Sequence, residues 1–194
     1  MKLSERTVAD LLSDFRSSDP TPGGGSASAL SGAVGASLLA MVAALPKPLA
    51  ATAEDVERLQ TAGARCAAYA NTLEGLIDRD SEAYDLVVSA YRLPKTTDAE
   101  KAARSSAIQD ALRAATEAPL DVMRACSAAL EQASVVARLG NRNASSDVGV
   151  AQELLKAGLR GAGLNVEINL GSIQDEGYVE RVRSEAGRLL AFTD

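Results

Sequence analysis

The sequence contains no histidine and no tryptophan among its 194 residues. Histidine is the usual general base near neutral pH and the commonest metal ligand, so its absence excludes a Ser-His-Asp triad and gives no reason to expect a metal site. Acid–base chemistry would therefore depend on Asp, Glu, Lys, Tyr or Cys side chains, or on the substrate itself.

Aromatic residues are also scarce, at 3% of the chain, although 46% of the residues are hydrophobic. Alanine, leucine and valine supply most of that fraction, which favours closely packed helices over a core built from rings. We find no convincing strand, and a chain of this length favours one domain over residues 1–194. The sequence therefore predicts an all-α fold of long helices packed orthogonally and antiparallel.

The chain has two cysteines, Cys66 and Cys126, which lie far apart inside helical patterns. They do not form a metal-type pair and are typical of buried small side chains in a reduced protein. The N-terminus has no apolar signal region, so we expect a cytoplasmic protein. The net charge of −6 argues against a general nucleic-acid binder.

An uncharged run extends from Gly23 to Pro46 and is long enough to cross a bilayer. The run is rich in Ser and Gly, however, and the other predicted helices are amphipathic. We interpret it as a central helix buried by its neighbours rather than as a membrane span. Its row of small residues, Ser28, Gly32, Ala36 and Ala40, predicts close contact with another helix, in this chain or in a second copy.

The stretch from Asp19 to Ser26 introduces this helix with two prolines and three consecutive glycines. Glycines before a helix N-terminus leave free N–H groups at the positive end of the helix dipole, which suits a carboxylate or phosphate. A tight turn into a buried helix, capped by Ser26 or Ser28, explains the same residues.

The other predicted helices span residues 4–15, 52–92, 98–138, 143–170 and 173–192. Pro119 is expected to kink or divide the 98–138 helix. The 52–92 helix has apolar residues alternately three and four positions apart, and Asp80 occupies one of these positions. If Asp80 is buried, its carboxylate must be paired, solvated in a pocket or functional. If this row of positions has turned towards solvent by residue 80, the carboxylate is simply exposed.

Three further groups admit both a structural and a functional interpretation. Arg92, Lys95, Lys101 and Arg104 form a basic cluster, either a solvated surface or a landing site for an anionic substrate tail. Asn143 or Ser145 can cap the next helix, with Asp147 in its first turn. Asn165 and Asn169 share a close-packed face, where they bond a neighbouring helix or a ligand.

Several blocks together resemble the formimidoyltetrahydrofolate cyclodeaminase / methenyltetrahydrofolate cyclohydrolase family. They are Pro22-Gly23-Gly24-Gly25-Ser26, Arg79-Asp80, Leu93-Pro94-Lys95, Asn143-Ala144-Ser145-Ser146-Asp147-Val148-Gly149 and Leu164-Asn165-Val166-Glu167-Ile168-Asn169. The resemblance covers nearly the whole chain and implies an all-α homodimer with the folate near the subunit interface. It implies hydrolysis of 5,10-methenyltetrahydrofolate to 10-formyltetrahydrofolate or, alternatively, closure of 5-formiminotetrahydrofolate to the methenyl compound with loss of ammonia.

The resemblance also assigns roles to residues. Asp80 is the expected catalytic carboxylate, with Asp147 as a second candidate and Lys95 as a tail-binding or proton-transfer group. Substrate-binding roles are implied for Pro22, Gly23, Gly24, Gly25, Ser26, Asn143, Ser145, Asn165 and Asn169. No cofactor is expected beyond the folate substrate, and neither nucleic acid nor a membrane is an expected partner. A non-catalytic helical dimer that binds folate or another anion remains the alternative of a different class.

Overall fold

The uncharged run becomes helix α2 (Gly24–Ala44), around which the other long helices pack. The computed structural model describes residues 2–46 and 52–191. In that part of the chain the helices are a 3₁₀ turn η1 (Leu3–Glu5), α1 (Val8–Phe15), α2, α3 (Ala53–Tyr91), α4 (Asp98–Leu139), a 3₁₀ turn η2 (Arg142–Ala144), α5 (Ser145–Leu170) and α6 (Glu176–Leu190). No strand occurs in the described residues, which confirms the all-α prediction.

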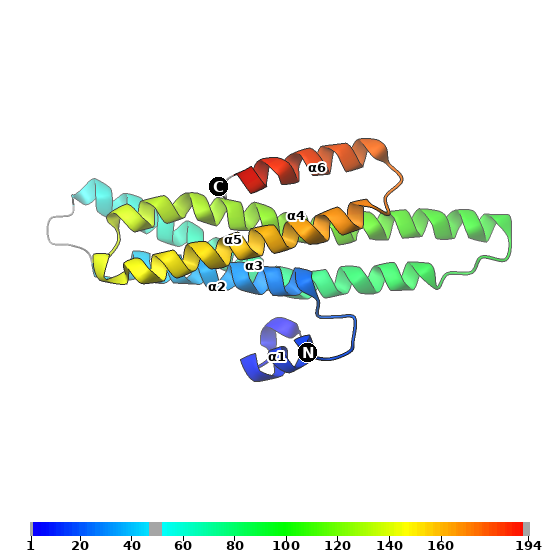
Figure 1. Cartoon of the computed structure of the whole chain (residues 1–194), viewed down its shortest axis with the longest axis horizontal. Helices are drawn as coiled ribbons and strands as arrows, with labels where there is room; N and C mark the ends of the chain where they lie inside the picture. Colours follow the sequence, from blue (N-terminus) through cyan, green and yellow to red (C-terminus); the bar gives the residue numbers. More distant parts are fainter. Residues whose placement is uncertain (1, 47–51, 192–194) are drawn as a thin grey trace.

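Helices α2 to α5 run along one axis as a bundle, and α6 lies along its outside (Figure 1). The antiparallel packing is confirmed. The expected orthogonal crossing of long helices is not seen, since in both views these helices share one direction. The short α1 lies outside the bundle, on the side that carries α2 and α3.

Small side chains set the distance between α2 and α5. A Cβ on Gly35 would lie 2.8 Å from the Ala151 carbonyl oxygen, and one on Gly158 would lie 2.8 Å from that of Ser28. Both distances are too short for a real contact, so the two backbones approach as closely as glycine permits. The small-residue row of α2 thus meets another helix, as predicted, and that helix belongs to the same chain.

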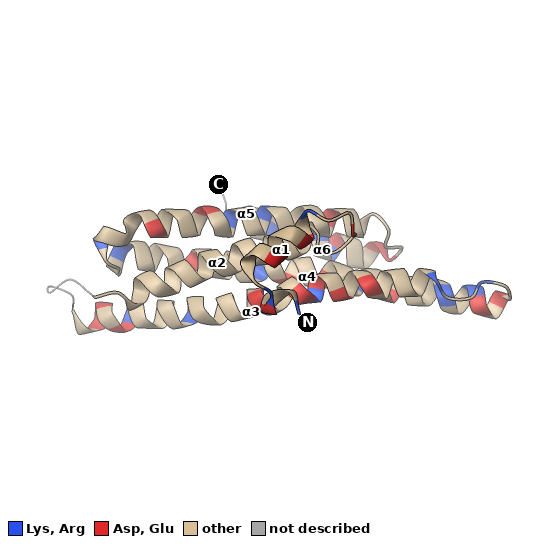
Figure 2. Ribbon diagram, turned by 90° about the horizontal axis from the view of Figure 1, so that it is seen from below, with Lys and Arg blue, Asp and Glu red and all other residues tan. Residues whose placement is uncertain are grey.

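Helix α2 is long and apolar enough, by length and composition, to span a membrane. Within the chain, 44% of its most apolar stretch is buried, and α2 packs against α3, α4 and α5. Figure 2 shows no charged residue along α2, whereas the far end of the α3–α4 hairpin carries both signs. This packing fits the interpretation of α2 as a core helix.

The apolar seam of α3 faces this core only over its first two thirds. Leu59, Cys66, Leu73 and Ile77 are almost completely buried, whereas Tyr84 and Tyr91 are 41% and 50% exposed. The exposed part belongs to a hairpin of α3 and α4 that extends beyond the other helices (Figure 1). Ala90, Ile108, Ala111 and Leu112 form a small separate core inside this hairpin. Asp80 lies where the seam leaves the main core.

The cysteines occupy the middle of the bundle, and both are free and completely buried. Burial raises the pKa of the Cys66 thiol to about 11 and that of the Cys126 thiol to about 12. They are packing residues, as the sequence indicated.

Helix α4 continues through Pro119 and is not divided there. A proline cannot donate to the carbonyl four residues earlier, so the Ala115 oxygen loses its helical partner. The Asn169 amide of α5 donates to this oxygen at 2.8 Å. Asn169, expected to bind substrate, therefore has a structural role that accounts for it: it satisfies the carbonyl that Pro119 leaves free.

We expect Asn169→Ala to lower the free energy of unfolding by about 1–2 kcal/mol, because a half-buried carbonyl loses its donor. The loss should be smaller in a Pro119→Ala background, where the new N–H can donate to Ala115. Urea denaturation of the two single variants and the double variant measures this coupling. Gln152→Ala, which removes an α5 amide with no side-chain hydrogen bond in the described residues, is the control. An equal loss in both backgrounds would contradict the assignment.

Candidate active site

The anion at the N-terminus of α2 is a carboxylate of the same chain, Asp80. Its Oδ2 accepts a hydrogen bond from the backbone N–H of Ser26 at 2.9 Å, and the Ser26 hydroxyl lies 3.2 Å away. The free N–H groups and the dipole of a helix N-terminus favour a negative group at this place. Asp80 thus caps α2 from α3, 54 residues away in the sequence.

The predicted capping by Ser26 or Ser28 is therefore wrong. The N-cap residue is Gly23, without a side-chain hydrogen bond, and α2 begins at Gly24, before either serine. Ser26 Oγ instead donates to the Ile77 carbonyl at 2.8 Å, and Ser28 Oγ donates to the Gly24 carbonyl at 2.7 Å. The cap could not be found locally because its acceptor comes from another helix.

The glycines of this turn make room for two polar side chains. A Cβ on Gly25 would overlap Asp80 Oδ1, so only glycine lets the carboxylate reach the helix end. A Cβ on Gly24 would lie 3.3 Å from Asn165 Nδ2. The α2 N-terminus is thus flanked by Asp80 of α3 and by Asn165 of α5.

The Asp80 carboxyl is half-buried, and the loss of hydration raises its pKa above the ordinary value. The hydrogen bonds from the Ser26 backbone and hydroxyl act in the opposite direction and offset only part of the shift. Oδ1 makes no hydrogen bond in the described residues, because Ser26 contacts Oδ2 alone. One oxygen is thus held in place while the other is left to receive a proton or a water molecule.

Asn165 has a side-chain oxygen that is available to a ligand. Its Nδ2 donates to the Gly161 carbonyl of its own helix at 2.9 Å, which fixes the side chain. Its Oδ1 has no donor among the described residues and lies beside Gly24. The start of α2 therefore brings together residues to which the family resemblance assigns site roles, namely Gly23, Gly24, Gly25, Ser26, Asp80 and Asn165. Pro22 leads into the same turn.

The other predicted site residues lie elsewhere in this chain. Lys95 is in the loop that ends the α3–α4 hairpin, and Tyr91 before it is 11 residues beyond Asp80, or about 17 Å along a helix. Asn143, Ser145 and Asp147 lie at the opposite end of α2, where Asn141 Nδ2 donates to the Pro46 carbonyl at 3.1 Å. A single copy of the chain therefore does not bring all of the predicted residues together around one point.

The start of α5 also differs in detail from the prediction. Neither Asn143 nor Ser145 caps it: the N-cap residue is Ala144, and Asn141 Oδ1 accepts from the Asn143 N–H at 3.0 Å. Asp147 lies in the first turn, as expected. In the basic cluster, Lys101 Nζ pairs with Asp98 at 2.9 Å, while Arg104 donates to the Tyr91 carbonyl and covers its ring.

A second buried carboxylate, Asp78, was missed by sequence reasoning. Its Oδ1 accepts from the backbone N–H of Leu3, and its Oδ2 accepts from the Ser4 hydroxyl at 2.6 Å. Asp78 thus fixes the N-terminal segment to α3, two residues before Asp80 fixes the glycine turn. No local pattern indicates this role, since both donors lie more than 70 positions away.

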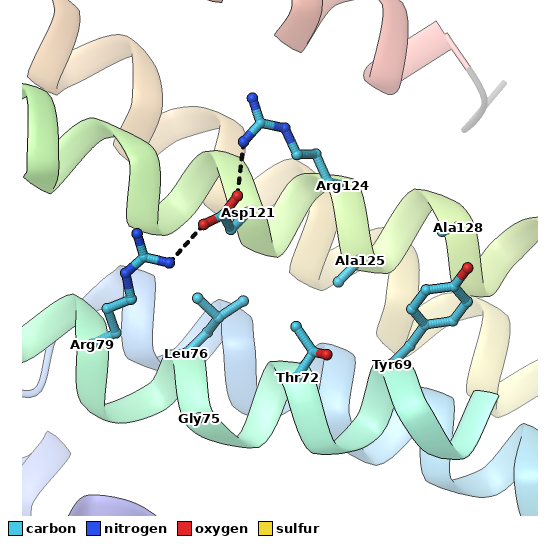
Figure 3. A pocket seen from close by; sticks show the side chains of 9 residues that line it. All are labelled: Tyr69, Thr72, Gly75, Leu76, Arg79, Asp121, Arg124, Ala125 and Ala128. Carbon is cyan, nitrogen blue, oxygen red and sulfur yellow. Dashed lines mark hydrogen bonds and ion pairs between the residues drawn. The ribbon is translucent and has the colours of Figure 1, made fainter. Parts of the chain in front are cut away.

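A groove of about 640 Å³ lies elsewhere, between α3 and α4 (Figure 3). Its charged groups already neutralise one another: Asp121 accepts from Arg79 and from Arg124, each at 2.7 Å. Arg124 also donates to Glu185 at 2.7 Å, which raises the pKa of its guanidinium further. These pairs leave Asp80 as the better centre for chemistry. No three metal-ligating side chains gather anywhere in the described ranges.

The architecture and this glycine turn define an all-α protein with a half-buried carboxylate at a helix N-terminus. Residues 7–188 match the family model described as formiminotransferase-cyclodeaminase. The chain belongs to this family.

Individual relatives are similar over almost the full chain. A methenyltetrahydrofolate cyclohydrolase of Methylorubrum extorquens is 43% identical over 185 residues, which cover 95% of this chain and 89% of that protein. A formimidoyltransferase-cyclodeaminase of Sus scrofa is 30% identical over 97% of this chain, which spans only 35% of that longer protein. The crystal structure of a formiminotetrahydrofolate cyclodeaminase from Thermotoga maritima superposes with a TM-score of 0.81 and 27% identity, covering 99% of this chain and 92% of that one.

The raised pKa of Asp80 has a consequence for stability. A carboxyl whose pKa is higher in the folded state binds more protons there, so the folded state loses stability as pH rises through the interval between the two pKa values. We therefore expect Asp80→Asn to be more stable than the wild type at pH 7, and this difference to disappear as the pH falls below the ordinary range of Asp. Urea denaturation across this pH range measures it. A variant less stable than the wild type at pH 7 would show that the ionised cap stabilises α2 more than burial costs.

Proposed function

We propose that this protein is a methenyltetrahydrofolate cyclohydrolase, which adds water to 5,10-methenyltetrahydrofolate and produces 10-formyltetrahydrofolate. The observation that carries the proposal is the Asp80 carboxylate, held by one oxygen at the α2 N-terminus with the other oxygen unpaired. The 43% identity to a cyclohydrolase of similar length supports this reaction over others known in the family.

The methenyl carbon lies in an amidinium, which is already electrophilic, so water can attack it without a metal. A carboxylate beside this cation would stabilise it electrostatically and orient the attacking water. Asp80 has the position and the raised pKa for this role, since a base works best when its pKa approaches the working pH. The glycine turn and Asn165 would bind the ring system around the reacting carbon.

One carboxylate can manage the protons of the whole reaction. Asp80 would take a proton from water as the C–O bond forms, leaving a hydroxyl on the former methenyl carbon. It would then return this proton to N5 as the C–N5 bond breaks, while the hydroxyl proton leaves to solvent and a formyl group remains on N10. The balance is one water consumed and one proton released, so no histidine is needed.

We also propose that the working unit is a homodimer. Asp147 and its block lie at the far end of α2 from Asp80, and the 21 residues of α2 correspond to about 30 Å. A two-fold axis near the middle of α2 would place the Asp147 end of one protomer beside the Asp80 end of the other. Lys95, in the opposite direction along α3, would then meet the carboxylates of the substrate's glutamate tail.

An uncovered apolar face on α2 supports this pairing. Val34 and Met41 are 44% and 40% exposed, and Leu30 and Leu38 beside them are only half-buried. With α1, they line a mainly apolar groove of about 510 Å³. A helix that is apolar on all sides is normally covered on all sides, and a second copy of the same face would cover it.

The cyclodeaminase reaction is the second candidate, favoured by the likeness to the Thermotoga maritima enzyme. A non-catalytic folate-binding dimer is a third. We further propose a cytoplasmic protein without a resident cofactor and without nucleic-acid or membrane partners. An absorbance assay of the purified protein separates the three functions, because methenyltetrahydrofolate is consumed in the first reaction, is formed with ammonia in the second, and is bound unchanged by the third.

We expect Asp80→Asn to lower kcat by at least 10²-fold, because the amide can neither take nor return a proton. The KM for methenyltetrahydrofolate should change much less, since the Ser26 cap can be kept by the amide oxygen. Stopped-flow loss of the methenyl absorbance gives both constants, and Asp110→Asn, an exposed aspartate on α4, is the matched control. Turnover by Asp80→Asn at the wild-type rate would remove Asp80 from the mechanism.

Subunit complementation tests the shared site. Asp80→Asn and Asp147→Asn should each be nearly inactive alone, but an equal mixture that exchanges subunits should recover about a quarter of wild-type activity, because half of the dimers then contain one intact site. The readout is turnover of the mixture before and after exchange, with each variant alone taken through the same treatment. No recovery, despite exchange shown by mass spectrometry of tagged subunits, would place the site within one protomer.

A further inference from the structure

A small polar cavity of about 250 Å³ lies beside the glycine turn, between the N-terminal segment and α3. Arg6 and Asp14 line it from the N-terminal segment, Asp19 and Pro22 from the approach to the turn, and Ser81 from α3. The cavity is large enough for one ring edge of a small molecule, and it was not apparent from any motif.

The cavity is connected to the reactive carboxylate through two hydroxyl groups. Ser81 Oγ lies 3.3 Å from Ser26 Oγ, which in turn lies 3.2 Å from Asp80 Oδ2. Its outer wall is held by Asp78, which binds both Leu3 and Ser4. A molecule reacting at Asp80 therefore has this cavity as an immediate neighbour.

The charges of the lining discriminate between ligands. Arg6 Nη1 lies 2.9 Å from Asp14 Oδ2, so these two lining residues form an ion pair with each other. The carboxylate of Asp19 makes no hydrogen bond or ion pair in the described part of the chain, so both of its oxygens are free. With one arginine and two aspartates the lining is net negative, which disfavours an anionic glutamate tail and favours a neutral group rich in N–H donors.

We propose that this cavity takes the 2-amino-4-oxopyrimidine edge of the substrate's pterin, and that Asp19 accepts hydrogen bonds from N3–H and the 2-amino group. Two adjacent donors facing a carboxylate form a bidentate, charge-assisted pair, the geometry that gives most specificity for its size. The proposal rests on the folate reaction proposed above and names Asp19 as a specificity residue of the same site.

The covalent structure of the substrate agrees with this placement. The methenyl carbon is bonded to N5 of the pterin and to N10 of the benzoylglutamate arm. When that carbon is at Asp80, the pterin lies on one side and the arm on the other. The pterin then enters the cavity next to Ser81, and the arm is directed away from it.

The test compares methenyltetrahydrofolate with its 2-desamino analogue, which lacks one of the two donors. We expect the wild type to prefer the natural substrate in kcat/KM by roughly 10- to 100-fold, the discrimination given by a hydrogen bond to a charged group. Asp19→Asn should raise the KM for the natural substrate by a similar factor with little change in kcat. It should raise the KM for the analogue by a smaller factor, because the analogue keeps only the N3–H donor, so that the preference narrows.

Two controls separate this role from a structural one. Arg16→Gln alters a charge on the same segment outside the cavity and should keep the wild-type preference. Asp78→Asn loosens the wall and should weaken both substrates together. An equal effect of Asp19→Asn on both substrates, or no effect on either, would overturn the proposal.

Calorimetric binding of tetrahydrofolate and its 2-desamino analogue gives the same comparison without turnover. If the wild type binds tetrahydrofolate with the expected preference but turns over neither folate substrate, the proposed reaction fails while the pterin site stands. If turnover is found without any preference for the 2-amino group, the pterin site fails alone.

Discussion

The N-terminus of α2 is stabilised by a carboxylate that belongs to another helix, and the rest of the site depends on that contact. Asp80 satisfies the Ser26 N–H of the first turn, so α3 must pass close to the glycines, and Gly25 must lack a side chain. One contact therefore explains three features of the sequence: the three glycines, the carboxylate in the apolar row of α3, and the close packing of α2. The same contact that completes a helix end also fixes a carboxylate in a partly dehydrated setting, where its proton affinity rises.

The bundle around this contact is rigid because its small side chains leave no freedom of register. Gly32 lies against Cys126 and Leu73, while Gly158 lies against the backbone of α2. Such contacts determine how α2, α4 and α5 lie relative to one another, and hence how Asn165 approaches the glycine turn. The outer parts are less constrained: the α3–α4 hairpin has only a small core of its own, and the N-terminal segment depends largely on Asp78. The closest helix packing therefore lies beside Asp80, and the smaller core lies at the far end of the α3–α4 hairpin.

The helices could be predicted from the sequence, because they rest on local periodicity. The same periodicity marked Asp80 as a carboxylate at an apolar position, while its catalytic role was implied only by the family resemblance. The capping box of Thr97 and Glu100, the end of a helix before Gly140 and the seam of α3 are all determined within a few residues. The features that were missed join distant positions: the cap of α2 by Asp80 and the anchor at Asp78. Asn169 shows the difficulty best, since the sequence left open whether its amide bonds a neighbouring helix or a ligand. Its partner, the Ala115 carbonyl that Pro119 leaves free, lies on another helix. A single sequence shows that a buried polar group needs a hydrogen-bond partner, but it does not show which residue is that partner.

The two cysteines give this bundle an internal reporter of its own integrity. Cys66 and Cys126 are fully enclosed, and the high pKa of each thiol leaves almost no thiolate at neutral pH. An alkylating reagent can therefore reach them only when α2, α3 and α4 separate. The rate of thiol modification would then measure the frequency with which the core opens, and it would do so without any label or engineered residue. The two small thiols of this core are therefore unreactive towards alkylation in the folded protein and become reactive when it unfolds.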